Sequence, residues 1–382
     1  MDPIVIIGSG LGGYTVAREL RKLDQNAPLT LITADDGRFY SKPTLSTALA
    51  SGKTPEALSL SDAIKIQGQL NAVVRTHTNV HAIDTATHTL SLDGETLRYS
   101  KLVLALGADP IRPRLEGDAA YAVLSVNDLT DYTHFRAALV GTHRIAIIGG
   151  GLIGCEFAND LASVGFEVTV VHFAPYPLDR LLPPPAGEAV LHALQRAGIK
   201  WHLNAQAVAV QRDGAFYKLV MADGSEVETD LVLSAIGLRP RTNLAEAAGI
   251  LTHRGIAVNR YLETSAQDVY ALGDCAEVEG LLLPYVMPLM QAARALAKTL
   301  ADNRTAVNYP AMPVVVKTPA CPVVAAPPPE DIVGEWEFEA SEDGLCGLFH
   351  DSEKKLRGFV LTEKEISRKN ILVQQLPDYL NS

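Results

Sequence analysis

The chain has 382 residues, 47% of them hydrophobic and 20% charged, and its formal net charge is −11. This length exceeds one ordinary hydrophobic core, so we expect two or three domains. The acidic balance argues against nucleic acid and against anionic membrane surfaces, because both attract basic patches. No apolar run reaches the ~20 residues of a membrane helix. A strand predicted to begin at Ile4 leaves no room for a signal peptide.

Four cysteines are spread through the sequence without a C-x-x-C pair. This spacing disfavours a disulfide scaffold, a zinc site and an iron–sulfur cluster. We therefore expect reduced thiols, no bound metal and a cytoplasmic protein.

The first motif follows the predicted strand Ile4–Ile7 and precedes a predicted helix over residues 14–20. Gly8, Gly10 and Gly13 fit the pattern G-x-G-x-x-G, in which the glycines allow a tight turn, a close pyrophosphate and close helix packing. The helix N-terminus favours negative charge. Glycine triplets also occur in ordinary turns, but this position between strand and helix predicts a dinucleotide site.

A second strand is predicted over residues 29–33, and Asp35 follows it, 22 residues beyond Gly13. A dinucleotide fold places the acid that binds ribose hydroxyls at about this distance; the alternative is a solvated turn. Lys42 precedes a proline and is expected in an extended loop, where a lysine is ordinarily a surface charge. Alternation over residues 76–84 predicts another strand.

The glycine motif recurs at Gly149, Gly151 and Gly154, at a constant offset of 141 residues and after the apolar run 144–148. Two copies of one plan predict two dinucleotides, and a flavin with a nicotinamide is the natural pair in one enzyme. A structural duplication with one inactive site is the alternative.

The second copy differs from the first after its second predicted strand, residues 167–171. His172 and Phe173 follow, so neither the acid typical of NAD sites nor the arginine typical of NADP sites is present. We expect His172 to be a solvated loop residue rather than a cofactor ligand. The choice between NADH and NADPH stays open locally.

Later segments add a further candidate residue and a change of character. Asp274 follows a predicted strand and could accept a ribityl hydroxyl or cap a helix, and a helix is predicted over residues 289–300. From Pro310 onward, antiparallel strands are predicted around Trp336, at residues 345–349 and at 356–361, before a short closing helix.

These elements together resemble the two-dinucleotide flavoprotein disulfide-reductase superfamily. The resemblance rests on residues 8–13, 104–107, 149–156, 236–240 and 270–274. It implies an α/β fold with two Rossmann-like, three-layer ββα dinucleotide-binding domains and a small α+β C-terminal domain. The implied boundaries are residues 1–108 and 240–309 for FAD, 109–239 for NAD(H), and 310–382 for the C-terminal domain.

Within the superfamily, the chain is most similar to the rubredoxin–NAD(+) reductases. Residues 33–36, 40–43, 151–160, 283–288 and 312–319 carry this similarity. The disulfide-reducing members have a cysteine pair after the second FAD strand, whereas this chain has Ser41 and Ser46 there. The family implies hydride transfer from NADH to FAD and single-electron transfer to rubredoxin, for alkane hydroxylation or oxygen and nitric oxide detoxification.

The resemblance also implies the site residues. FAD is expected to contact Gly8, Ser9, Gly10, Leu11, Gly12, Gly13, Thr33, Ala34, Asp35, Lys42, Val80, Glu156, Asp274, Val286 and Lys317. NAD is expected to lie against Gly149, Gly151 and Gly154. Catalytic roles are implied for Lys42 and Glu156, as an ion pair beside flavin N5, and for Lys317, offsetting charge at N1 and the C2 carbonyl.

The sequence also bears on how the chain would bind rubredoxin and on two alternative functions. An acidic rubredoxin would need a local basic patch on this acidic chain, and Arg38, Arg239 and Arg241 are candidates. We expect a monomer. The alternatives are a ferredoxin reductase of an oxygenase system and a non-catalytic, NADH-sensing flavoprotein.

Overall fold

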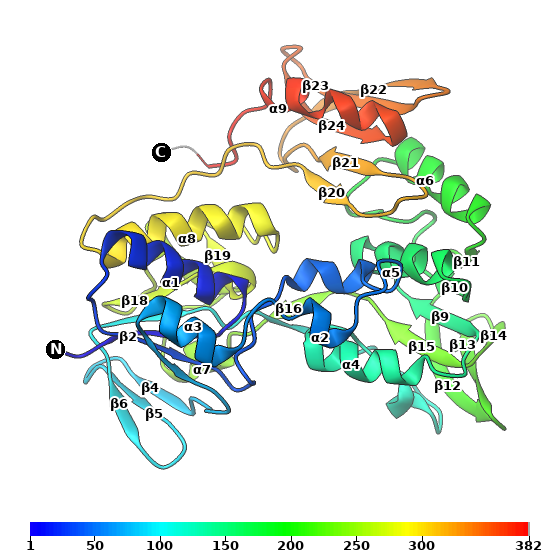
Figure 1. The fold of residues 1–382 in the computed structure, drawn as a ribbon. Coiled ribbons are helices and arrows are strands. Elements are labelled where there is room, and N and C mark those ends of the chain that lie inside the picture. The colour runs from blue at the N-terminus through cyan, green and yellow to red at the C-terminus, as the bar shows by residue number, and fades with distance from the viewer. Residues whose placement is uncertain (381–382) are drawn as a thin grey trace.

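The computed structural model describes residues 1–380 and contains three bodies (Figure 1). The first lobe carries the N-terminal chain and helix α8, the second lobe carries the central chain, and the C-terminal sheet lies beside the second lobe. No helix among residues 1–380 has both the length and the apolar character to cross a bilayer.

The first lobe is built on a five-stranded parallel sheet. Its strands, in spatial order, are β18 (Val269–Ala271), β7 (Lys101–Leu104), β1 (Ile4–Ile7), β2 (Leu29–Ile32) and β3 (Val73–Arg75). Its main helices are α1 (Leu11–Leu23), α3 (Ala63–Leu70) and α8 (Val286–Leu300), and α1 packs against both others. Every residue of β1 and β2 is buried, which is typical of parallel strands covered on both faces.

Smaller elements complete the first lobe. They are the antiparallel strands β4 (Ala82–Asp84), β5 (Thr89–Ser91) and β6 (Thr96–Arg98), α7 (Asn243–Ala247), the parallel pair β17 (Ile256–Val258) and β19 (Ala276–Val278), and η3 (Gly273–Cys275). The segment that holds η1 (Lys42–Thr47) and α2 (Pro55–Leu58) leaves the first lobe and packs against helices of the second lobe. The predicted strand over residues 76–84 is wrong for most of its length, since only β4 forms there. His77 has a positive φ of 49°, which breaks an extended strand.

The second lobe repeats this plan with four parallel strands. Their order is β11 (Lys200–His202), β10 (Glu167–Val171), β9 (Arg144–Ile148) and β15 (Leu231–Ser234). Helices α4 (Leu129–Ala138), α5 (Leu152–Ser163) and α6 (Pro184–Arg196) and the short η2 (Ala120–Ala122) accompany them. A three-stranded antiparallel sheet adds β12 (Ala207–Asp213), β13 (Phe216–Met221) and β14 (Glu226–Thr229).

Alternate residues of β9 serve two different cores. Ile145 and Ile147 pack with α5, whereas Ala146 and Ile148 pack with the antiparallel sheet. This follows from the strand geometry, because successive side chains point to opposite faces. The result is a three-layer arrangement of antiparallel sheet, parallel sheet and helix, which confirms the predicted fold class together with the equivalent layers of the first lobe.

Two antiparallel segments join the lobes. Strand β8 (Ala108–Pro110) leaves the first lobe and pairs with β16 (Leu238–Pro240), which returns to it (Figure 1). Arg239 stands opposite Asp109 in this pair. The second lobe is therefore inserted into the chain of the first.

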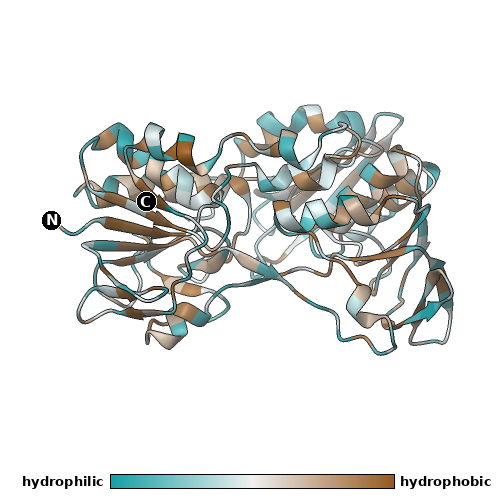
Figure 2. Ribbon diagram, turned by 60° about the horizontal axis from the view of Figure 1, so that its bottom comes forward, coloured by the Kyte–Doolittle hydropathy of each residue, from teal (hydrophilic) through white to brown (hydrophobic). Residues whose placement is uncertain are grey.

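The C-terminal sheet has five antiparallel strands. Their order is β20 (Val314–Val316), β21 (Val323–Ala326), β24 (Leu356–Thr362), β23 (Gly344–Asp351) and β22 (Gly334–Ser341), followed by η4 (Glu363–Arg368) and α9 (Lys369–Val373). Helix α6 of the second lobe packs against β23 and β24. The chain end then returns to the first lobe, where the N–H of Tyr309 donates to the carbonyl of Leu380 at 3.0 Å. Figure 2 shows the apolar residues concentrated in the sheets and the polar residues on turns.

Candidate functional site

Each large parallel sheet carries a glycine turn at the carboxyl end of an inner strand, β1 or β9. Gly8 and Gly149 take φ angles of +114° and +107°, a region that favours glycine. A Cβ on Gly13 would lie 2.0 Å from the carbonyl oxygen of Gly8, and one on Gly154 would lie 1.9 Å from that of Gly149. Each helix therefore approaches its turn so closely that only glycine fits.

Gly10 and Gly151 face open space instead. No heavy atom of the described chain lies within 4 Å of a Cβ placed on either residue. Each is the N-cap residue of α1 or α5 and provides no side-chain cap. Backbone N–H groups at a helix N-terminus bind phosphate. The residues at both turns therefore fit the pyrophosphate of a dinucleotide.

The first turn has an acid beside it. One carboxylate oxygen of Asp35 accepts hydrogen bonds from Thr33 Oγ1 at 2.6 Å, from Ser9 Oγ at 3.1 Å and from the N–H of Gly37 at 2.9 Å. Ser9 and Thr33 are buried, whereas Asp35 is exposed. The structure thus brings together three residues that the sequence places 26 positions apart at most. Ala34 lies between Thr33 and Asp35.

Four further predicted FAD contacts lie in separate segments of the chain. Lys42 opens η1, and its ammonium lies 4.0 Å from a carboxylate oxygen of Asp274 in η3. Burial lowers the pKa of Lys42, and Asp274 partly offsets this. Val286 is the exposed first residue of α8, which begins three residues earlier than predicted. Val80 lies half-buried in the loop between β3 and β4.

Glu156 lies where the second lobe meets the η1 segment and the C-terminal sheet. It is a fully buried residue of α5, and its Oε2 lies 3.2 Å from Lys317 Nζ, just after β20. Its Oε1 accepts the backbone N–H of Lys317 at 3.0 Å. Ser46 Oγ of η1 also donates to the Glu156 carboxylate, and Lys317 Nζ donates to the carbonyl of Pro43.

The predicted ion pair between Lys42 and Glu156 is therefore wrong. Lys317 is the lysine that reaches Glu156, while Lys42 lies beside Asp274. The physical reason is the position of the C-terminal sheet, whose β20 brings a lysine from 161 residues away onto α5. Ser46 supplies a hydroxyl to the same carboxylate.

Two more polar residues of α5 were not predicted as site residues. Asn159 accepts the backbone N–H of Ala320 at 3.0 Å, and Asp160 accepts those of Leu49 and Ala50 at 2.9 and 3.0 Å. Both side chains are buried. A signal was available, because Glu156, Asn159 and Asp160 fall at i, i+3 and i+4 on one face of an otherwise apolar helix.

His172 is buried, so the expectation of a solvated loop residue is wrong. Its Nδ1 accepts the backbone N–H of Gly150 at 3.1 Å, and its Nε2 lies 3.0 Å from a carboxylate oxygen of Asp179. Burial lowers the pKa of His172. The imidazole therefore lies directly against the second glycine turn. Sequence spacing alone gave no sign of Asp179.

The four cysteine thiols are not suited to thiol exchange. Cys155, Cys275, Cys321 and Cys346 are free and buried. Burial raises the pKa of Cys275 to about 11 and that of Cys321 to about 12. These thiols are protonated at neutral pH, whereas thiol exchange needs a thiolate.

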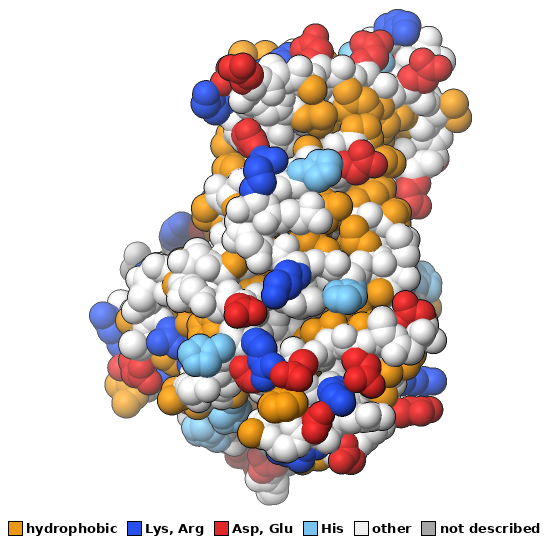
Figure 3. All heavy atoms as spheres, turned by 90° about the vertical axis from the view of Figure 1, so that its right-hand side faces the viewer, with side chains coloured by type: hydrophobic (Ala, Val, Ile, Leu, Met, Phe, Trp, Pro, Cys, Tyr) orange, Lys and Arg blue, Asp and Glu red, His pale blue; other side chains and the backbone are white. Residues whose placement is uncertain are grey.

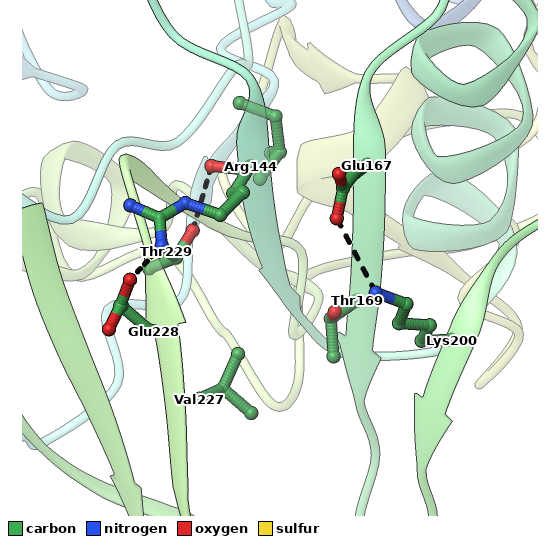
Figure 4. Close-up of a pocket in the computed structure, with 8 residues that line it drawn as sticks. Arg144, Glu167, Thr169, Lys200, Val227, Glu228 and Thr229 are labelled. Atoms are coloured by element: carbon green, nitrogen blue, oxygen red, sulfur yellow. Dashed lines mark hydrogen bonds and ion pairs between the residues drawn. The ribbon is translucent and has the colours of Figure 1, made fainter.

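A cavity of about 330 Å³ lies at the opposite edge of the second sheet from its glycine turn (Figure 4). Arg144, Glu167 and Lys200 are the first residues of β9, β10 and β11 and line it. Glu167 pairs with Lys200, and Arg144 pairs with Glu228 and Asp230. This cavity is lined by satisfied ion pairs and is separate from the nucleotide turns.

The three candidate docking arginines do not form a free basic patch. Arg38 pairs with Asp36 at 2.7 Å, and Arg241 pairs with Asp109 at 2.6 Å. Arg239 is exposed on β16. On the face formed by the second lobe and the C-terminal sheet, acidic and basic side chains are interspersed (Figure 3).

Comparison with known proteins identifies two family models. Residues 2–298 match the pyridine nucleotide-disulphide oxidoreductases, and residues 306–376 match the rubredoxin binding C-terminal domain. The second match covers the whole C-terminal sheet and includes Lys317.

Full-length relatives and a solved structure agree with these matches. The chain is 50% identical to the rubredoxin-NAD(+) reductase of Alcanivorax borkumensis over 99% of both chains. It is 48% identical to that of Acinetobacter baylyi over 100% of this chain and 99% of the relative. The structure of a ferredoxin reductase for the CYP199A2 system of Rhodopseudomonas palustris superposes with a TM-score of 0.89 at 26% identity, covering 99% of this chain and 96% of the other.

Proposed function

Because the chain belongs to the pyridine nucleotide-disulphide oxidoreductase family, we propose that it is an NADH-dependent flavoprotein reductase that delivers single electrons to rubredoxin. One observation carries this function. The domain that matches the rubredoxin-binding family contributes Lys317 to Glu156, a buried residue of the helix that begins at the second nucleotide turn. This contact supports a docking site for the electron-accepting partner close to the NADH turn.

The chain's own groups supply binding and charge. Gly8–Gly13 offers backbone N–H groups to the FAD pyrophosphate, and Asp35 offers a carboxylate to ribose hydroxyls. Asp274 is an acceptor for a ribityl hydroxyl. We assign the remaining FAD contacts to Leu11, Gly12, Thr33, Ala34, Lys42, Val80, Glu156, Val286 and Lys317. We assign the NADH pyrophosphate to Gly149, Gly151 and Gly154.

Bound FAD supplies the hydride-accepting and one-electron-donating chemistry. The protein places two ammonium groups, Lys42 and Lys317, on the elements that border this site, each beside a carboxylate. Positive charge there favours the reduced, anionic flavin. Ser46 in place of a thiol, together with the buried and protonated cysteines, supports direct electron transfer rather than thiol exchange.

The proposal also assigns a ligand or partner to each segment of the chain. The segments 1–108 and 240–309 are proposed to bind FAD, 109–239 to bind NADH, and 310–382 to complete the flavin site and dock rubredoxin. We propose a cytoplasmic monomer. Rubredoxin then carries the electrons to alkane hydroxylation or to oxygen and nitric oxide detoxification.

Steady-state assays with two acceptors test this function. The purified, FAD-loaded protein is mixed with NADH and either rubredoxin or a [2Fe–2S] ferredoxin. We expect rapid reduction of rubredoxin and slow reduction of ferredoxin. Faster reduction of ferredoxin would support the ferredoxin-reductase alternative, and reduction of neither would support the NADH-sensing alternative.

A further inference from the structure

The two glycine turns can be compared residue by residue. In the first lobe, Ile7 pairs with Ile32, and in the second lobe Ile148 pairs with Val171. The N–H of the first glycine donates to the carbonyl of the last strand residue at 2.8 Å in both lobes. Thr33 and His172, which come next, therefore occupy the same place in the two lobes.

From this place, each lobe links its glycine turn to an acid. In the first lobe, Ser9 Oγ donates to Thr33 Oγ1 at 2.8 Å, and both hydroxyls donate to Asp35. In the second lobe, the N–H of Gly150 donates to His172, and His172 contacts Asp179. The order of turn, strand-end residue and carboxylate is the same in both.

In the second lobe, a smaller residue in the turn compensates for a larger residue at the strand end. Gly150 corresponds to Ser9, and a Cβ on Gly150 would lie only 2.9 Å from His172 Cγ. The glycine makes room for the imidazole, which is longer than the threonine side chain. The longer side chain spans the distance to a carboxylate seven residues further along the chain.

The loop after β10 is fixed to the same turn. The N–H of Leu178 donates to the carbonyl of Gly150 at 2.8 Å, and Leu178 has a positive φ of 60°. Asp179 follows immediately and keeps 20% of its side chain exposed. Because the Gly150 N–H donates to His172 Nδ1, the neutral imidazole carries its proton on Nε2 and donates it to Asp179.

We propose that Asp179 is the specificity-determining acid of the second nucleotide site, where it binds the adenosine ribose hydroxyls of NADH and disfavours the 2′-phosphate of NADPH. His172 is its positioning residue. This inference rests on the proposed function. It identifies an acid for the nucleotide site of the second lobe, where none follows directly after β10. The exposed Arg180, next along the chain, is the competing candidate and would favour a 2′-phosphate.

Ligand binding without redox chemistry tests the proposal. Dissociation constants of ADP-ribose and 2′-phospho-ADP-ribose are measured by calorimetry on the oxidised, FAD-loaded protein. We expect wild type to prefer ADP-ribose. Asp179→Asn should weaken ADP-ribose by about tenfold, the size of a lost hydrogen bond to a charged group, and reduce the preference. Asp223→Asn, in an exposed turn of the same lobe, should change neither constant.

Two further variants guard against misfolding and test positioning. Asp179→Ser serves if Asp179→Asn loses FAD, and His172→Gln should reduce the preference for ADP-ribose without abolishing it. An unchanged ratio of the two constants in the Asp179 variants would overturn the inference alone. A wild-type preference for the 2′-phosphate would overturn it in favour of Arg180. Failure of wild type to bind either ligand would overturn the proposed function as well.

Discussion

Within each glycine motif, some glycines are required by the packing of the fold and others leave space for a ligand. Gly13 and Gly154 are required by packing, because a Cβ would collide with backbone oxygens. Gly10 and Gly151 are not required by packing, because the space beside them is open. The sequence motif assigned pyrophosphate approach to the second glycine and helix packing to the third, and the structure shows the close helix packing at Gly13 and Gly154.

Replacing these glycines by alanine should therefore give different outcomes. Gly13→Ala should destabilise the protein by several kcal/mol through the backbone collision. Gly10→Ala should leave the apoprotein fold intact but weaken FAD retention, and Gly151→Ala should retain FAD while raising the KM for NADH about tenfold or more. Thermal unfolding, FAD content and steady-state kinetics measure these effects. FAD loss from Gly151→Ala would contradict the assignment of the two turns.

His172 should make the second lobe sensitive to acid. Its pKa in the folded protein is lowered from the ordinary value of 6.5 by burial, while Asp179 raises it and Arg180 lowers it further. The unfolded chain therefore takes up a proton first on acidification, and the stability contributed by neutral His172 is complete above pH 6.5 and falls below it. Melting temperatures between pH 7.5 and 5 should fall more steeply for wild type than for His172→Asn. Parallel curves would contradict this role.

Lys317 should tune the flavin. Lys317→Ala removes a positive charge that is partly exposed, so a modest lowering of the FAD reduction potential is expected, by ~10–30 mV on the scale of a two-electron couple. Spectroscopic redox titration measures it, and Lys364→Ala, at an exposed lysine of the C-terminal domain that pairs with Asp343, is the control. A potential equal to that of wild type would exclude an electrostatic role for Lys317.

At the scale of elements, α5 connects the second lobe to the η1 segment and to the C-terminal domain. Its N-terminus is the second nucleotide turn, and one face carries Glu156, Asn159 and Asp160. These side chains bind Ser46 of η1, Leu49 and Ala50 shortly after it, and the segment after β20. The sequence predicted the helix and its glycines. It could not predict these partners, because each lies more than 100 residues away and is brought there by tertiary packing.

Loss of the Asp160 contacts should loosen this connection. Asp160→Ala removes the carboxylate that accepts the backbone N–H groups of Leu49 and Ala50, and because these groups are only part-buried the expected loss is about 0.5–1.5 kcal/mol for each hydrogen bond. Denaturant unfolding should show this loss, whereas Ile153→Ala on the exposed side of α5 should change stability little. A similar small effect of both substitutions would contradict a connecting role for Asp160.

At the scale of the whole molecule, the sequence predicted more of the architecture than of the site. The duplicated glycine motif predicted two ββα lobes, because strand, turn and helix are all encoded within about 25 residues. The lysine partner of Glu156 and the burial of His172 were mispredicted, because they depend on how the C-terminal sheet and the loop after β10 dock. The match of residues 306–376 to a rubredoxin-binding family supports rubredoxin as the partner.

The most direct test of the proposed electron flow from NADH through FAD to rubredoxin is an anaerobic stopped-flow experiment on the FAD-loaded protein. NADH is mixed with the oxidised protein first, and rubredoxin or ferredoxin is added in a second mixing step. We predict rapid bleaching of the flavin by NADH, followed by fast reoxidation with rubredoxin at two rubredoxins per FAD. Flavin that NADH does not bleach, or that rubredoxin reoxidises no faster than ferredoxin, would contradict the proposed function.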